Sequence, residues 1–465
     1  MEGQMGAMFY AGLLVTLALI VAAGVYAARM VRSAEDYSVG GHKSGPMIVI
    51  GVFVGTLVGG AATIGTAQLA FCVGLSAWWF TLGCGVGLLA LGLFYAKPLR
   101  GSSLETISQF LVLNFGERAG LITSVSSSIG IFFSIVASFL SAAHLLSAVF
   151  GLPVAASIAL MGVVILVSIF GGGINGVGLV GVIKLLLVYV TMCIGGLAVY
   201  GEMGGWQGFA GSFPAFPWFS LVEKGFWPTM GDLLAMVVGI LATQTYVQAV
   251  YSARSTRVAA VSCFASALII VPIGLPVIAI GMFMQARHPD ILPINALPLF
   301  MLQYMPPFLG GAGIMALLIS SVGSSAGLAL GVATMLSRDL LAKWARQGDS
   351  ARMLRLNRLC VLAVTLIAAV VTYVNMHAMV LNLNFYSMAF RAAAVIVPMS
   401  IAIFLPGRLG AHGAVGAMAA GIGAALLTPL LFPPGVNPIM PGLAASFAVA
   451  LCLMLLRNHA EKARL

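Results

Sequence analysis

The sequence is a succession of long apolar runs joined by short polar connections. We identify thirteen such runs, at residues 8–28, 47–71, 76–96, 120–149, 153–170, 177–200, 232–253, 261–285, 310–336, 358–376, 384–405, 411–432 and 440–456. Most of them approach the roughly 20 residues that a helix needs to cross a hydrocarbon core of about 30 Å. Hydrophobic residues make up 61% of the chain and charged residues 7%, which excludes a soluble globular domain. We therefore predict an all-α, multi-pass integral membrane protein with thirteen transmembrane helices.

The positive charges alternate between the two sides of this predicted topology. Of the 22 Lys and Arg residues, 18 fall in connections on one side, and only Lys224 and Arg287 fall on the other. Because cytoplasmic connections are enriched in Lys and Arg, we expect the N-terminus outside and the C-terminus in the cytoplasm. We expect a bacterial inner (plasma) membrane. The same distribution leaves no basic patch for nucleic acid.

The second apolar run, 47–71, is poorly suited to an unbroken helix. Its middle is rich in glycine and polar residues, at Gly51, Gly55, Gly59, Gly60, Thr63, Gly65, Thr66 and Gln68. Each glycine lowers helix stability by about 1 kcal/mol relative to alanine. One interpretation is a helix that packs closely against a neighbour through its small residues. The other is a helix interrupted at mid-membrane, whose free backbone groups bind an ion and a solute.

Acidic residues are absent from the centres of all these runs. Each of the 12 Asp and Glu residues falls in a connection or at the end of a run, so no carboxylate is placed to ligate a cation or relay protons within the bilayer. A cation would have to be held by carbonyl and hydroxyl oxygens. The sequence also contains no Walker-type loop, HExxH or GxSxG motif. We expect a protein that is not an enzyme and has no organic cofactor.

Several motifs, in order along the chain, resemble the solute:sodium symporter family. They are RSAEDYSVGGHKSG at 32–45, VGGAATIGTAQLAFCVGLSAWW at 58–79, SSLETISQFLVLNFGERAG at 102–120, GGGINGVGLVGVIKLLL at 171–187, the segment from ALPLF to SRDLL at 296–341, and FRAAAVIVP at 390–398. The family includes proline, galactose and sialic-acid sodium symporters, and this chain resembles it as a divergent member. The resemblance implies a leucine-transporter-like fold with two inverted five-helix repeats, each opening with a discontinuous helix.

The resemblance also implies a division of the chain. The core would comprise a first repeat at 47–200 and a second, inverted repeat at 232–405. An extra N-terminal helix and loop would occupy 1–46 and an extracellular loop 201–231. Two peripheral helices and a short tail would follow at 406–465.

In that family a sodium ion lies between the broken second helix and the ninth helix. Carried over to this chain, its ligands would be the backbone carbonyls of Gly55, Val58 and Ser320 and the side-chain hydroxyl of Ser324. Gly323 replaces a second expected hydroxyl, so one ligand is missing unless Ser325 or Ser321 takes its place. An alternative is that these serines only bond back within a closely packed helix. A shift of one helical turn in the alignment would also exchange the two serine pairs.

A second departure from the family pattern is a lysine in the sixth run. Where many members carry Thr-Asp, this chain has Val180 and Gly181, and Lys184 follows about one helical turn later. A lysine within the bilayer is costly and is a candidate functional residue. Its ammonium would occupy or neighbour the vacated sodium site and act as a tethered cation. The alternative is that the side chain extends to the cytoplasmic interface.

We expect the substrate site at the bilayer midplane, between the two broken helices. The candidate residues are Gly59, Gly60, Ala62, Thr63 and Gln68 on the first helix, and Thr243, Gln244, Tyr246 and Gln248 on the second. Sugar and sialic-acid transporters of the family place several polar groups here. Because the first helix offers mainly small residues instead, a small solute is expected rather than a sugar.

These observations favour a secondary active transporter that moves a small organic solute by alternating access, with Na⁺ as the coupling ion. Three alternatives remain open at this stage. They are proton-coupled or ion-independent transport in which Lys184 replaces the sodium ion, a sensory domain without transport, and a passive channel. The expected partners are a small-molecule solute and the lipid bilayer, with no nucleic acid and no obligate protein partner.

Overall fold

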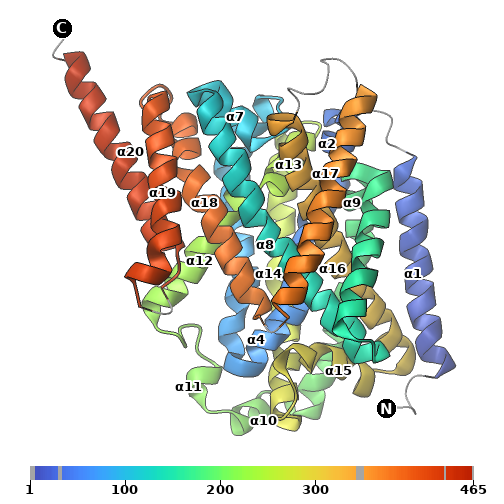
Figure 1. Cartoon of the computed structure of the whole chain (residues 1–465). Helices are drawn as coiled ribbons and strands as arrows, with labels where there is room; N and C mark the ends of the chain where they lie inside the picture. Colours follow the sequence, from blue (N-terminus) through green and yellow to red (C-terminus); the bar gives the residue numbers. More distant parts are fainter. Residues whose placement is uncertain (1–5, 30–33, 342–349, 377, 434–435, 463–465) are drawn as a thin grey trace.

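The computed structural model describes residues 6–29, 34–341, 350–376, 378–433 and 436–462, which fold almost entirely into helices (Figure 1). The longer α-helices are α1 (Ala7–Ala28), α3 (Pro46–Leu57), α4 (Thr66–Val73), α5 (Trp79–Ala90), α7 (Ile107–Phe115), α8 (Glu117–Phe150), α9 (Val154–Glu202), α10 (Gly205–Ser212), α12 (Phe226–Leu241), α13 (Gln244–Ser252), α14 (Thr256–Arg287), α15 (Ala296–Gln303), α16 (Pro307–Met335), α17 (Ser350–Val374), α18 (Val380–Phe404), α19 (Ala411–Leu431) and α20 (Ile439–Lys462). Short helices are α2 (Ala34–Val39), α6 (Ala96–Gly101) and α11 (Ala215–Trp218), and π-helical turns lie at Ala61–Gly65, Leu91–Tyr95 and Leu336–Leu340.

The prediction of an all-α, multi-pass membrane protein is confirmed. Among the described residues, ten helices are long and apolar enough to cross a membrane, or eleven if α12 and α13 are counted as one bent span. The helices Pro46–Leu57 and Val154–Leu166 are apolar but shorter. Each of the thirteen predicted runs falls on helical segments, but helix length and composition alone give ten or eleven crossings rather than thirteen.

Two of the predicted runs, 153–170 and 177–200, are joined in one helical segment. α9 extends from Val154 to Glu202, and its apolar parts are Val154–Leu166 and Ile174–Glu202. A Cβ atom added at Gly178 in this helix would lie only 2.7 Å from the carbonyl oxygen of Ile48 in α3. Gly178 therefore serves a close helix contact, which only a residue without a side chain permits.

Two helices are interrupted near their middle, as the sequence predicted. α3 begins with Pro46 in its first turn, where the missing N–H costs no hydrogen bond, and ends at Leu57. Val58 is non-helical (φ −80°, ψ 74°), and the chain then continues through a π-helical turn into α4. The second interruption, at Ala242 and Thr243, separates α12 from α13, whose axes differ by 41°.

The helices divide into a buried centre and a lipid-exposed periphery. The difference is clear in the most apolar 18-residue window of each helix. In α16, 94% of this window is buried inside the protein, compared with 33% in α1 and 22% in α20. Figure 1 shows α1 at one edge of the molecule and α19 and α20 at the opposite edge. The candidate ion and substrate residues therefore lie on the central helices, where the backbone of the broken helices is protected from lipid.

Candidate functional site

The break after α3 lies where α9 and α16 converge, and glycine permits this approach. A Cβ atom on Gly51 would lie 2.0 Å from the carbonyl oxygen of Gly178. One on Gly55 would lie 2.7 Å from Cα of Gly181. Both interpretations of the glycine-rich run therefore apply, because the helix packs closely against α9 and also breaks. Lys184, about one turn after Gly181, lies beside Ser320 and Gly323 of α16.

The break frees backbone carbonyls of α3, and hydroxyls of α16 donate to them. The last carbonyls of a helix have no partner within it. The hydroxyl of Ser324 donates to the carbonyl of Thr56 at 2.6 Å, and that of Ser320 donates to the carbonyl of Val58. These serines therefore bond across the helix interface rather than back into their own helix. A cluster of neutral oxygens, the kind of ligand that suits a hard monovalent cation, results between α3 and α16.

Lys184 enters this cluster from α9. Its side chain is 1% exposed, and its ammonium donates a hydrogen bond of 2.9 Å to the carbonyl oxygen of Ser320. Among the described residues, no carboxylate forms an ion pair with it. The side chain thus does not extend to the cytoplasmic interface. It lies against one of the carbonyls that the family resemblance assigns to sodium.

Gly323 provides the space that this lysine fills. A Cβ atom on Gly323 would lie 3.0 Å from Nζ of Lys184 and 3.4 Å from its Cδ and Cε. The ammonium of Lys184 therefore lies next to the position where the expected hydroxyl is missing. Two other hydroxyls of α16, those of Ser321 and Ser325, are buried without a hydrogen-bond partner among the described residues.

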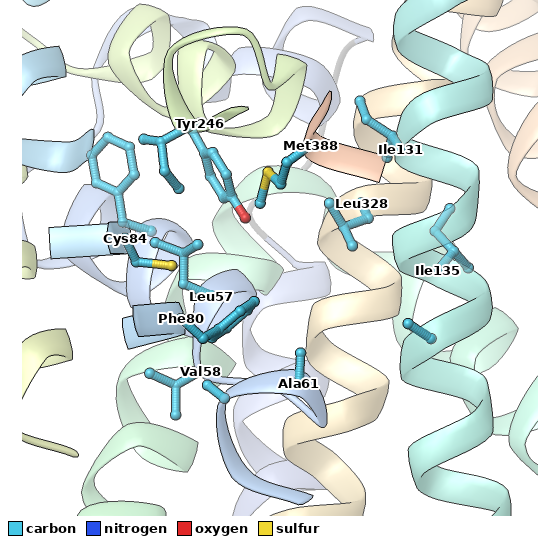
Figure 2. Packing of buried hydrophobic residues seen from close by; sticks show 14 of the residues in the cluster. Leu57, Val58, Ala61, Phe80, Cys84, Ile131, Ile135, Tyr246, Leu328 and Met388 are labelled. Carbon is cyan, nitrogen blue, oxygen red and sulfur yellow. The ribbon is translucent and has the colours of Figure 1, made fainter. Parts of the chain in front are cut away.

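A small cavity adjoins the oxygen cluster. It is lined by Thr56, Leu57, Gly59, Ala61, Phe80, Ser134, Ser138, Tyr246, Ser324, Leu328, Asn384 and Met388. In Figure 2 the hydroxyl of Tyr246 points into the space between Met388 and Leu57. The volume open to the centre of a water-sized sphere is about 20 Å³, enough for a water molecule. An organic solute requires this cavity to expand.

Two of the nine predicted substrate residues, Gly59 and Tyr246, line this cavity. Gly60 instead faces α8, where an added Cβ would lie 2.5 Å from Cβ of Ser141. Ala62 is fully buried. The hydroxyls of Thr63 and Thr243 donate back to the carbonyls of Gly59 and Gly239, and the side-chain oxygen of Gln68 accepts from the backbone N–H of Val380.

Gln244 and Gln248 connect α13 to α2 and to the start of α7. The side-chain oxygen of Gln244 accepts from the N–H of Ile107 at 2.9 Å, and its amide donates to the carbonyl of Glu105 at 2.9 Å. The amide of Gln248 donates to the carbonyl of Ser38 at 2.6 Å. These glutamines therefore hold three chain segments together in this conformation.

Charged groups extend the same network. Glu105 accepts from the hydroxyl of Ser38 at 2.5 Å and pairs with the Arg338 guanidinium at 3.2 Å. Asp339 accepts from the hydroxyls of Thr106 and Ser124 at 3.0 and 2.8 Å. We call the set Ser38, Glu105, Gln244, Gln248, Arg338 and Asp339 the inner network. The inner network joins α2, the connection before α7, α13 and the π-helical turn after α16.

Sequence reasoning missed most of the cavity wall. Phe80, Ser134, Ser138, Asn384 and Met388 come from three other helices, and no local pattern distinguishes them from ordinary packing residues. The FRAAAVIVP motif does mark a sequence segment that contacts this wall. Its arginine, Arg391, is fully buried and donates to the hydroxyl of Ser134 at 3.2 Å.

Comparison with known proteins decides the family. The model of the sodium:solute symporter family matches residues 37–421. The chain belongs to this family. The match spans the broken helix, α9 and α16, so it includes the oxygen cluster and the cavity.

Relatives within the family carry different solutes. The human high affinity choline transporter 1 is 25% identical over 366 residues, which cover 71% of this chain and 62% of that protein. The sodium/sialic acid symporter NanT of Aliivibrio fischeri is 26% identical and covers 81% and 78%. The osmoregulated proline transporter OpuE of Bacillus subtilis is 24% identical and covers 95% and 93%. The chain matches about 60% of the length of the choline transporters.

Solved transporters share the overall helical arrangement of this chain. A Na⁺-coupled sialic acid symporter in a substrate-bound, outward-open state superimposes with a TM-score of 0.81 at 18% identity, covering 97% of this chain and 98% of that chain. Mhp1, a nucleobase-cation-symport-1 family transporter in a closed conformation, gives a TM-score of 0.61 at 13% identity, covering 93% and 96%. The helical arrangement is therefore that of a transporter fold.

Proposed function

We propose that the protein is a secondary active transporter that moves a small organic solute across the membrane by alternating access. The observation that carries this proposal is the cavity of buried residues beside the broken helix, which touches both interrupted helices through Gly59 and Tyr246. Alternating access requires a binding site within the protein between its moving halves, whereas a channel needs a continuous path. Repeats at 47–200 and 232–405 would supply the two halves that move.

The lining of the cavity supports a small solute. None of its twelve lining residues is an acid or a base, so recognition depends on hydroxyl, amide and carbonyl groups together with apolar contacts. Phe80, Leu57 and Leu328 supply apolar surface, while Tyr246 and Asn384 supply polar groups. A sugar or sialic acid would need more polar partners than these.

Cation coupling follows from the way the cavity adjoins the oxygen cluster. Thr56 and Ser324 line the cavity, and they are also joined by the hydrogen bond between α3 and α16. Solute binding and cation binding would therefore act on the same helix contact. We propose Gly55, Val58, Ser320, Ser324 and Ser325 as the residues of the cation site, which corresponds to the sodium site of the family.

The inner network would act as the gate on one side. It joins the loop before α3, the α6–α7 connection, α13 and the end of α16. Separation of these segments would open the cavity toward that side. We propose thirteen crossings in a bacterial inner membrane, with the N-terminus outside, so that this gate faces the cytoplasm.

Solute counterflow in proteoliposomes tests the proposed function. Vesicles containing purified protein and unlabelled solute are diluted into trace radiolabelled L-proline, choline or N-acetylneuraminic acid, with a thermal-shift screen of amino acids and betaines to extend the panel. Counterflow needs no ion gradient, so it reports transport alone. We expect saturable exchange of one small solute. Flux proportional to concentration would indicate a channel, and a solute that stabilises the protein but does not exchange would indicate a receptor.

A further inference from the structure

The cation position between α3 and α16 already contains a positive charge. The Lys184 ammonium donates to the Ser320 carbonyl at 2.9 Å, and the Ser320 hydroxyl in turn donates to the Val58 carbonyl. Two of the three carbonyls expected to ligate sodium are therefore engaged, one of them by the lysine itself. An ammonium and a sodium ion are both monovalent cations that neutral oxygens stabilise, and the lysine occupies one of the expected sodium ligands, the Ser320 carbonyl.

The surroundings of Lys184 are adapted to a side chain that ends here. Gly323 has no Cβ, and the space that a Cβ would occupy lies 3.0 Å from Nζ. On the opposite side, Gly181 and Gly55 let α9 approach α3 so closely that an added Cβ on Gly55 would lie 2.7 Å from Gly181. The lysine therefore reaches the oxygen cluster because three glycines permit it.

No acidic group compensates this charge among the described residues. The four ion pairs found there involve Glu35, Asp232, Glu202 and Glu105, and none of them includes Lys184. A second cation placed in the same cluster would meet the ammonium at short range in a medium of low polarity, where like charges repel strongly. The cluster thus has room for one cation.

We propose that the Lys184 ammonium is the resident cation between α3 and α16, held in place of Na⁺, so that this site neither binds Na⁺ nor uses its gradient. The inference rests on the proposed transport function and concerns its coupling. A cation attached to α9 cannot leave with the solute when α3 and α16 separate. Solute movement is then not driven by sodium through this site.

Sodium binding to the purified full-length protein tests this directly. Thermal unfolding is measured across a NaCl titration at constant ionic strength, with KCl as the balancing salt. A ligand that binds the folded state alone raises its stability. We expect the wild type to unfold at the same temperature in both salts. We expect Lys184→Gln/Gly323→Ser, which removes the ammonium and restores a hydroxyl, to gain about 2 °C in NaCl, and to lose this gain when Ser324→Ala is added.

The matched control is Arg391→Gln, which removes another fully buried positive charge outside the oxygen cluster. We expect no sodium response from it. Binding of ²²Na⁺ to the wild type provides a second measurement if a variant fails to fold.

Three outcomes would overturn the proposal. The first is sodium binding to the wild type that Ser324→Ala abolishes. The second is a folded Lys184→Gln/Gly323→Ser protein without any sodium response. The third combines two results. The unfolding temperature of the wild type rises in NaCl even with Ser324→Ala, which reports a different sodium site, and Lys184→Gln/Gly323→Ser shows no additional rise that depends on Ser324. Counterflow is measured with equal NaCl on both sides of the membrane, so its loss would contradict the transport function and leave the identity of the resident cation to these binding data.

Discussion

Gly323 and Lys184, on helices far apart in the sequence, share one small volume: a Cβ atom on the glycine would lie 3.0 Å from Nζ of the lysine. The same ammonium donates to the Ser320 carbonyl, one turn earlier on α16. A side chain at 323 and a lysine at 184 therefore exclude one another unless the lysine shifts and weakens this hydrogen bond.

The first prediction is that Gly323→Ala destabilises the protein more than an alanine substitution at a glycine with open space around it. Overpacking of a filled site costs about 1–3 kcal/mol, while alanine gains up to about 1 kcal/mol of helix propensity. The matched control is Gly423→Ala in α19, where an added Cβ would meet nothing within 4 Å. Chemical denaturation in detergent should show Gly323→Ala to be less stable than Gly423→Ala by about 1–3 kcal/mol.

A double-mutant cycle separates this contact from general strain. In a Lys184→Met background the ammonium is gone, and Gly323→Ala should cost less than in the wild type. Coupling between contacting residues is about 0.5–3 kcal/mol. Strictly additive effects of the two substitutions would contradict the shared volume.

The pairing of these residues could be anticipated from the sequence only in outline. The family motifs placed a glycine where a hydroxyl was expected and a lysine near a missing aspartate. They did not show that the two departures meet, because this depends on how closely α9 approaches α16. The packing of α9 against α3, which helps to position Lys184, depends on Gly55 and Gly181, and these glycines could equally have served a turn.

Gln244 and Gln248 illustrate what the sequence could not reveal. Both are polar residues in a broken helix, which suggested substrate contact. Their partners, Glu105, Ile107 and Ser38, lie 137 to 210 residues away, and no periodicity encodes such contacts. The breaks themselves were predictable, since glycine at 59 and 60 and polar residues at 243 to 245 disfavour helix locally.

The second prediction concerns the inner network. The side chains of Glu105 and Arg338 form an ion pair at 3.2 Å and are only 17% and 21% exposed. Glu105 also accepts a hydrogen bond from the hydroxyl of Ser38. Glu105→Gln removes the charge but retains the shape, so we expect it to lower the free energy of unfolding by about 1–2 kcal/mol, since hydrogen bonds to charged groups contribute more than neutral ones.

The control for that substitution is Glu202→Gln. Glu202 pairs with Arg287 at 4.0 Å, and both side chains are about half exposed, at 46% and 50%. Exposed pairs of this kind contribute about 0–1 kcal/mol, so we expect a change below about 0.5 kcal/mol. Equal effects of the two substitutions would show that the inner network does not stabilise the closed conformation.

A third prediction follows from the glycine contacts that bring α9 to α3. Gly51→Ala would place a Cβ 2.0 Å from the Gly178 carbonyl oxygen, and neither backbone can yield without separating the helices. We expect a loss of about 3 kcal/mol or failure to fold. Gly423→Ala again provides the control, and unchanged stability of Gly51→Ala would mean that α3 and α9 are farther apart than described.

The fourth prediction tests the cavity as the substrate site. Tyr246 is 3% exposed, and its hydroxyl points into the cavity that Phe80 and Met388 also line (Figure 2). Tyr246→Phe removes one hydroxyl and leaves the ring, so a lost hydrogen bond to the solute, about 0.5–1.5 kcal/mol, should raise the half-saturating concentration in counterflow by roughly 2- to 13-fold. Tyr373→Phe changes a tyrosine that is 53% exposed on α17 and should leave this concentration unaltered. If both variants retained wild-type half-saturation, the solute would not contact the Tyr246 hydroxyl, and the site would have to be sought along the Ser134 and Asn384 side of the cavity.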